Sequence, residues 1–127
     1  MADNKIEQYL IDLTLSYRKD EGHDVWLVDD EEHEIRDVAI AFVSSLVIVR
    51  TVVMKAPAEN RLELFTKLLE LNATDVVHGA YALEGDQIVL IDTLEYETMD
   101  CSEFRATLDA FSLALAQHYP VLSKYRQ

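Results

Sequence analysis

The chain has 127 residues, of which half are hydrophobic, and it contains only 3 Gly and 2 Pro. This length and composition fit one globular domain over residues 1–127 and exclude a disordered or collagen-like chain. Asp and Glu number 24 against 11 Lys and Arg, which gives a net charge of −13. Such a charge argues against partners such as nucleic acid or anionic membranes. It suits solubility and basic partners, but acidity alone identifies no partner.

The amino-terminal segment and the single cysteine narrow the class of protein further. The start, MADNKIEQYL, lacks the basic segment and apolar run of a signal peptide. Nowhere do about 18 uncharged apolar residues follow one another, as a membrane-spanning helix requires. Cys101, the only cysteine, can form neither an internal disulfide nor a cysteine-type zinc site. We therefore expect a cytoplasmic protein of bacterial type.

The first half of the chain predicts one helix followed by three strands. A helix is expected over residues 4–18, where apolar residues recur with helical spacing at Ile6, Leu10, Leu13 and Tyr17. Runs rich in Val, Ile and Phe predict strands over 23–28, 37–43 and 46–54. The Ser-Ser pair at 44–45 forms either a tight turn, which we favour, or a bulge in one longer strand.

The second half predicts a helix, a hairpin and a last helix. The helix is expected to run from Ala56, with Pro57 in its first turn, to about Leu71, where Asn72 is a plausible left-handed stop. Strands over 79–83 and 87–94 flank a Gly-Asp turn signal.

The last helix is expected to begin at Asp100, because Glu103 three residues later completes a capping-box pattern. Its apolar stripe predicts Phe111 as a core residue. The element order is then α-β-β-β-α-β-β-α. Hairpin-length connections favour an α+β fold with an antiparallel sheet of about five strands packed against helices.

Several local patterns, in this order, resemble one known family. They are Leu68-Leu69-Glu70-Leu71-Asn72, His78-Gly79-Ala80-Tyr81-Ala82-Leu83, Glu84-Gly85-Asp86, Val53-Met54-Lys55-Ala56-Pro57 and His118-Tyr119-Pro120-Val121-Leu122. They span roughly residues 23–125 and resemble the YbjN-like family of bacterial sensory transduction regulators. The resemblance implies a fold similar to that of type III secretion chaperones. It also implies a non-enzymatic interaction or regulatory role, since the related chaperones are small acidic homodimers.

Candidate catalytic or metal-binding residues are few. The acidic loop at 29–34, with His23 and His33, could bind a cation, because carboxylates and imidazoles are metal ligands. The loop lacks the EF-hand pattern, however, and a solvated turn is the favoured interpretation. With Gly only at 22, 79 and 85, the P-loop, the dinucleotide fingerprint and the G-x-S-x-G elbow are all excluded. We expect no metal and no cofactor.

Cys101 near a helix start could in principle be an activated nucleophile, with His78 or His118 as its base. Asp100 and Glu103 lie beside it in sequence, and negative neighbours oppose thiolate formation. A structural role is therefore the favoured interpretation.

The second predicted helix carries two apolar stripes. At about 100° per residue, Leu62, Phe65 and Leu69 fall on one side, and Leu64, Leu68 and Leu71 lie about 120° away. One sheet covers only about 100° of a helix. Either the domain covers this helix deeply, or one stripe awaits a partner. We take Leu64, Leu68 and Leu71 as the candidate interface for a dimer or another protein partner.

Two functional hypotheses follow. The first is a non-enzymatic protein-interaction module, chaperone-like or regulatory, that forms an acidic homodimer and binds another protein by strand addition or in an apolar groove. The second is a metal-dependent or hydrolytic enzyme that uses loop 29–34 with His23 and His33. We favour the first hypothesis.

Overall fold

The computed structural model describes residues 2–20, 22–31 and 35–126. It contains three α-helices, six strands and a final 3-10 turn in this region: α1 (Ala2–Asp12), β1 (Ser16–Asp20), β2 (Val25–Asp30), β3 (Ile35–Val43), β4 (Leu46–Lys55), α2 (Arg61–Thr74), β5 (Ala80–Glu84), β6 (Gln87–Glu95), α3 (Cys101–Leu122) and η1 (Ser123–Tyr125).

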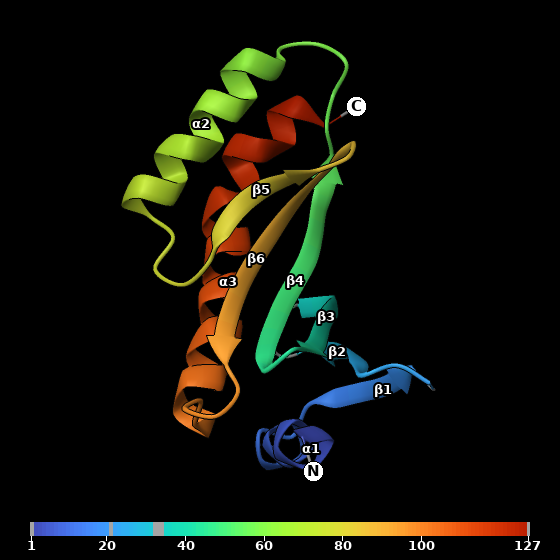
Figure 1. The fold of residues 1–127 in the computed structure, drawn as a ribbon. Helices are drawn as coiled ribbons and strands as arrows, with labels where there is room; N and C mark the ends of the chain where they lie inside the picture. The colour runs from blue at the N-terminus through green and yellow to red at the C-terminus, as the bar shows by residue number, and fades with distance from the viewer. Residues whose placement is uncertain (1, 21, 32–34, 127) are drawn as a thin grey trace.

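The six strands form one antiparallel sheet in the order β1-β2-β3-β4-β6-β5. The sheet twists strongly, and α2 and α3 lie on the same side of it, with α1 at the end near β1 and β2 (Figure 1). Alternate side chains of the strands point toward these helices. The buried residues Trp26, Ile40 and Val49 lie side by side in the register on that face.

The predicted α+β class and the antiparallel sheet are confirmed, but the sheet has six strands rather than about five. The additional strand is β1, which overlaps the end of the helix predicted over 4–18. The helix ends at Asp12, and Thr14 then adopts a left-handed conformation with φ 59°. Tyr17, which matched the helical spacing, instead pairs with Val28 across the β1–β2 ladder.

The predicted turns and the last helix cap are confirmed. Ser44 and Ser45 both have positive φ, 47° and 69°, so the pair forms the tight turn between β3 and β4. Gly85 has φ 60° in the turn between β5 and β6. Asp100 accepts a hydrogen bond from the Glu103 N–H at 2.8 Å, and the Glu103 carboxylate accepts one from the Asp100 N–H at 3.1 Å.

The predicted limits of the second helix are wrong at both ends. It begins at Arg61, because the preceding chain is buried at Ala56 and Pro57 and the Ala56 N–H donates to the Asp86 carbonyl at 2.7 Å. It continues past Asn72 to Thr74. Asn72 is therefore not a left-handed stop, and its side chain has a different role, described below.

Phe111 of α3 is fully buried in the core. Its ring lies close to the backbone at Gly79, just before β5. Gly79 makes this approach possible. A Cβ on Gly79 would lie 2.7 Å from the Ile91 carbonyl oxygen and 3.0 Å from Phe111 Cε1, and its φ of +92° also favours glycine. The expected core position of Phe111 is thus confirmed.

Replacing Phe111 by alanine should lower the free energy of unfolding by about 3–5 kcal/mol, because it removes a fully buried aromatic ring and leaves a cavity. Chemical denaturation measures the change. Leu113→Ala, two residues further along α3 and 55% exposed, is the matched control and should change stability by less than about 0.5 kcal/mol. A similarly small effect of Phe111→Ala would contradict the core assignment.

Candidate protein-binding surface

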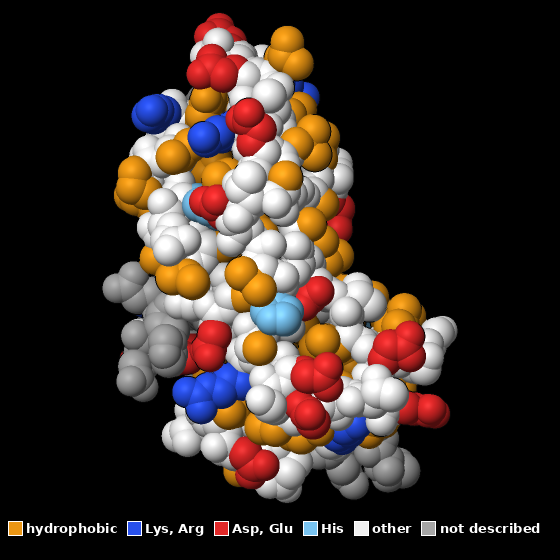
Figure 2. Space-filling view, turned by 90° about the vertical axis from the view of Figure 1, so that its left-hand side faces the viewer, with side chains coloured by type: hydrophobic (Ala, Val, Ile, Leu, Met, Phe, Trp, Pro, Cys, Tyr) orange, Lys and Arg blue, Asp and Glu red, His pale blue; other side chains and the backbone are white. Residues whose placement is uncertain are grey.

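The outer side of α2 displays a stripe of apolar side chains. Leu62 is 83% exposed and Leu69 is 68% exposed, while Phe65 between them is half-buried. Leu83 of the neighbouring edge strand β5 is 52% exposed. Figure 2 looks onto this side of the molecule and shows hydrophobic side chains exposed among charged ones in its upper half.

A shallow hollow of about 200 Å³ lies between α2 and β5. It is lined by Phe65, Leu68, Leu69, Tyr81, Ala82, Leu83 and Ile88. All seven side chains are apolar or aromatic. We call Leu62, Phe65, Leu69 and Leu83, with this hollow, the α2–β5 surface.

The sequence prediction assigned the two stripes of this helix the wrong way round. Leu64 is fully buried, and Leu68 and Leu71 are each only 6% exposed. These three leucines pack into the core of the chain, so they cannot themselves form an interface with another chain. The angular step separated the stripes correctly, but it contains no information about which stripe faces the sheet. The stripe left exposed is Leu62, Phe65 and Leu69.

Asn72 holds the edge of the sheet against α2. Its Oδ1 accepts a hydrogen bond from the Tyr81 N–H at 2.7 Å, and its Nδ2 donates to the Tyr81 carbonyl at 3.1 Å. In the β5–β6 register, Ala80 and Ala82 exchange bonds with β6, so the peptide groups of Tyr81 face the open edge. The asparagine amide thus occupies part of that edge, as an added strand would. An asparagine within a helix, where it is a poor helix former, was the available signal for such a role.

The Tyr81 ring continues this junction into α3. Its hydroxyl lies 2.7 Å from His118 Nδ1, and His118 Nε2 lies 3.3 Å from the Asp75 carboxylate. Burial raises the pKa of Tyr81 to about 12, and the charge of Asp75 adds to the rise. The pKa of Asp75 is lowered, first by the Thr74 hydroxyl and then by His118. His118 is only 3% exposed and has a partner on each ring nitrogen, so its role is to join α2, β5 and α3.

This placement separates His118 from Cys101. The two residues lie at opposite ends of α3, 17 residues apart, which corresponds to roughly 25 Å along the helix. Burial raises the pKa of the Cys101 thiol, and the carboxylates of Asp12 and Asp100 raise it further. The geometry therefore provides no Cys101–His118 nucleophile pair and disfavours the thiolate.

The structure describes only part of the acidic loop at 29–34. Glu32, His33 and Glu34 lie outside the described residues. His23 is exposed and pairs with Asp20 at 3.3 Å, and Asp29 accepts a hydrogen bond from the Asp37 N–H at 2.8 Å. Within the described ranges, no group of three metal-ligating side chains comes together.

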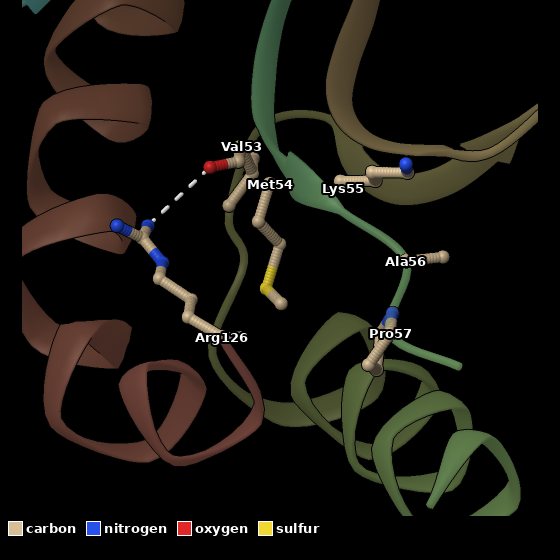
Figure 3. A pocket seen from close by; sticks show the side chains of 6 residues that line it. All are labelled: Val53, Met54, Lys55, Ala56, Pro57 and Arg126. Carbon is tan, nitrogen blue, oxygen red and sulfur yellow. Dashed lines mark hydrogen bonds between the residues drawn. The ribbon is translucent and has the colours of Figure 1, made fainter. Parts of the chain in front are cut away.

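A further hollow, of about 260 Å³, lies where β4 leaves the sheet (Figure 3). It is lined by Val53, Met54, Lys55, Ala56, Pro57 and Arg126. Arg126 Nη2 donates to the Val53 carbonyl at 3.3 Å, and its guanidinium lies over the Tyr119 ring. The lining contains no carboxylate, imidazole or thiol, so the hollow holds no acid–base pair for catalysis. Its arginine ties the end of the chain to β4.

Solved structures define the class to which this fold belongs. YbjN from E. coli, described as a candidate transcription regulator, aligns with a TM-score of 0.70 and 16% identity over 93% of this chain and 91% of its own. A chain from the complex of the Yersinia pestis type III secretion chaperone SycH with a YscM2 fragment aligns with a TM-score of 0.66 and 15% identity, covering 92% and 98%. A chain from the Pseudomonas aeruginosa ExoU–SpcU complex gives 0.64 and 10%, covering 91% and 95%. The fold is therefore that of the type III secretion chaperones, as the resemblance implied.

The family follows from the sequence itself. The family model CesT_Tir_1 matches residues 2–127, and the chain therefore belongs to this family. No curated protein sequence matches the chain. Among the described residues, no helix is long and apolar enough to cross a membrane.

Asn72→Ala should remove both hydrogen bonds to Tyr81 and lower the free energy of unfolding by about 1–3 kcal/mol, since the peptide groups lose their partner. Hydrogen exchange of the Tyr81 amide should accelerate by more than exchange in β4. Thr66→Ala, at an exposed position of the same helix, is the control and should alter neither quantity appreciably. Unchanged exchange at Tyr81 in the Asn72 variant would show that the edge is held by something else.

Proposed function

We propose that the protein is a non-enzymatic, cytoplasmic protein-binding module of the chaperone or regulator kind, and that it acts as a homodimer. The exposed apolar stripe on α2 carries the proposal. Leu62 and Leu69 stand largely in solvent on a well-formed helix, although Leu64, Leu68 and Leu71 already anchor the other side of that helix in the core. Isolated exposed leucines are common, but a stripe of them next to an apolar hollow is typical of an interaction surface.

The relatives support protein binding rather than catalysis. SycH is crystallised with a fragment of YscM2, HopA1–SchA is described as a chaperone–effector complex, and ExoU–SpcU as a heterodimeric complex. The HopA1–SchA structure aligns with a TM-score of 0.66 at 6% identity, over 90% of this chain and 89% of that one. The TM-scores of these alignments establish a shared fold, and the binding role is transferred to this chain as part of the proposal.

A second copy of the chain fits the α2–β5 surface. A twofold axis lets one apolar patch cover itself, so no separate complementary surface is needed. Burial of an exposed leucine contributes about 1.5–3 kcal/mol. The net charge of −13 opposes association, but salt screens this repulsion over about 8–10 Å, whereas the apolar contact is local.

Leu62→Glu combined with Leu69→Glu should produce a folded monomer, because both side chains are exposed in the single chain and only a dimer buries them. Light scattering and sedimentation at tens of micromolar measure the mass. Ile11→Glu with Leu113→Glu, which changes two exposed apolar residues on α1 and α3 (57% and 55% exposed), is the control and should remain dimeric. Leu64→Glu should unfold the chain, since Leu64 is fully buried. A parent protein that is already monomeric at these concentrations would refute the homodimer.

Binding of another protein is tested separately by affinity capture from the lysate of the source organism. The tagged parent chain should retain one or a few partners in near-stoichiometric amounts, and the unfolded Leu64→Glu variant should not retain the same ones. Mass spectrometry identifies them, and reconstitution from purified components checks that the contact is direct. Failure of every captured protein to bind the purified chain would contradict the proposed function.

A further inference from the structure

One face of the sheet is not covered by the helices. The helices contact the opposite face. Glu7 of α1 accepts a hydrogen bond from Trp26 Nε1 on that face, and Thr107 of α3 donates one to Asp92 there. In Figure 1 the other side of β4 carries no helix. Within the described residues, side chains on that side therefore face outward from the sheet. We call it the open sheet face.

The central rows of the open sheet face are mostly apolar, apart from Arg50 between Ala39 and Ile91 and Thr93 beside Ile48. The antiparallel registers place its residues in neighbouring rows, since directly opposed residues share a face. These residues are Val25, Leu27, Ala39, Ala41, Ile48 and Ile91. The small side chains of Ala39 and Ala41 lie between the larger ones of β2 and β4. Val43 and Val52, at 51% and 45% exposure, lie at the two ends of this strip.

Acidic residues surround this apolar centre. By the same registers, Asp20, Asp29, Glu84 and Glu95 lie on the open sheet face, and Asp37 joins them through its ion pair with Arg18. It also carries three basic residues: Arg18 lies 3.3 Å from Asp37, Arg50 lies 2.7 Å from Glu84, and Lys55 lies opposite Gln87 in the register. Five carboxylates against three basic side chains leave this face with a net negative charge.

We propose that the open sheet face binds a basic amphipathic helix of a partner protein, with apolar side chains on the strip and Lys or Arg beside the acidic rim. The inference rests on the proposed protein-binding function and names the chemistry of the partner. A helix is the element that covers one face of a sheet in layered folds. A second copy of this chain fits poorly here, because it would place the same surplus of carboxylates opposite itself.

The direct probe is a synthetic peptide of about 18 residues, built from Leu and Lys with the leucines on one helical stripe. Fluorescence anisotropy of the labelled peptide gives its dissociation constant at physiological salt. A twin with Glu in place of Lys and a peptide with the same residues in scrambled order test charge and amphipathicity. The parent chain should bind the ordered Lys peptide and bind both others at least about tenfold more weakly, a difference well above measurement error.

A charge-matched pair of variants locates the site. Val43→Lys with Val52→Lys adds two positive charges to the open sheet face, whereas Ile11→Lys with Leu113→Lys adds the same charge at equally exposed positions elsewhere. The first variant should weaken peptide binding at least about tenfold, and the second by less than about threefold. Thermal melting confirms that both remain folded.

Other outcomes overturn the inference. Equal weakening by the two variants, or equal binding of the scrambled peptide, would reduce the effect to general attraction between opposite charges. Loss of binding only in Leu62→Glu with Leu69→Glu would place the peptide on the α2–β5 surface, which refutes the open sheet face but not the proposed function. A mass change from dimer to monomer in Val43→Lys with Val52→Lys would show that a second copy covers this face.

Discussion

Tyr81 is the residue at which α2, the edge strand β5 and α3 are joined. Its peptide group is bound on both sides by the Asn72 side chain, and its hydroxyl contacts His118, which in turn reaches Asp75. Because these contacts bind both the last turns of α2 and the middle of β5, they fix the rotation of the helix about its axis. That rotation directs Leu64 inward and leaves Leu62 outside. The exposed apolar stripe is thus a consequence of a polar junction about two turns further along the same helix.

Short sequence patterns correctly predicted the turns and the last helix cap, which are held by contacts between residues close in the sequence. The capping box at Asp100 and the turn at Gly85 are set by backbone geometry and by neighbouring side chains, and both form as the sequence indicated. Strand β1 was missed because Tyr17 falls at a helical interval from Ile6 by coincidence, and its pairing with Val28 depends on a strand further along the chain. The helix ends where Thr14 adopts a left-handed conformation. Because β-branched residues rarely adopt this conformation, a threonine at this position did not indicate a helix end.

The candidate surface was predictable only in outline. Helical periodicity revealed that one helix has more apolar circumference than a sheet can cover, but choosing the exposed stripe requires the tertiary contacts of Tyr81. The open sheet face was hidden for a related reason. Strands with apolar residues at every position are typical of burial on both faces. In β3 and β4 only one of the alternating sets is buried, while Ala39, Ala41 and Ile48 of the other set stay half-exposed.

The two proposed surfaces differ in charge and lie on opposite sides of the sheet. Both could therefore be occupied at the same time. The α2–β5 surface is apolar and is the proposed dimer interface, whereas the open sheet face has a surplus of carboxylates and lies across the sheet from the helices. In the proposed homodimer, two subunits of charge −13 would repel each other on association, and a bound basic helix would lower the charge that each brings to the dimer. If both proposals hold, binding of a basic partner would favour dimerisation, and by thermodynamic reciprocity dimerisation would favour binding of that partner to the same extent. The coupling is electrostatic, so it weakens as salt shortens the range of the repulsion, while the apolar contacts of both surfaces persist.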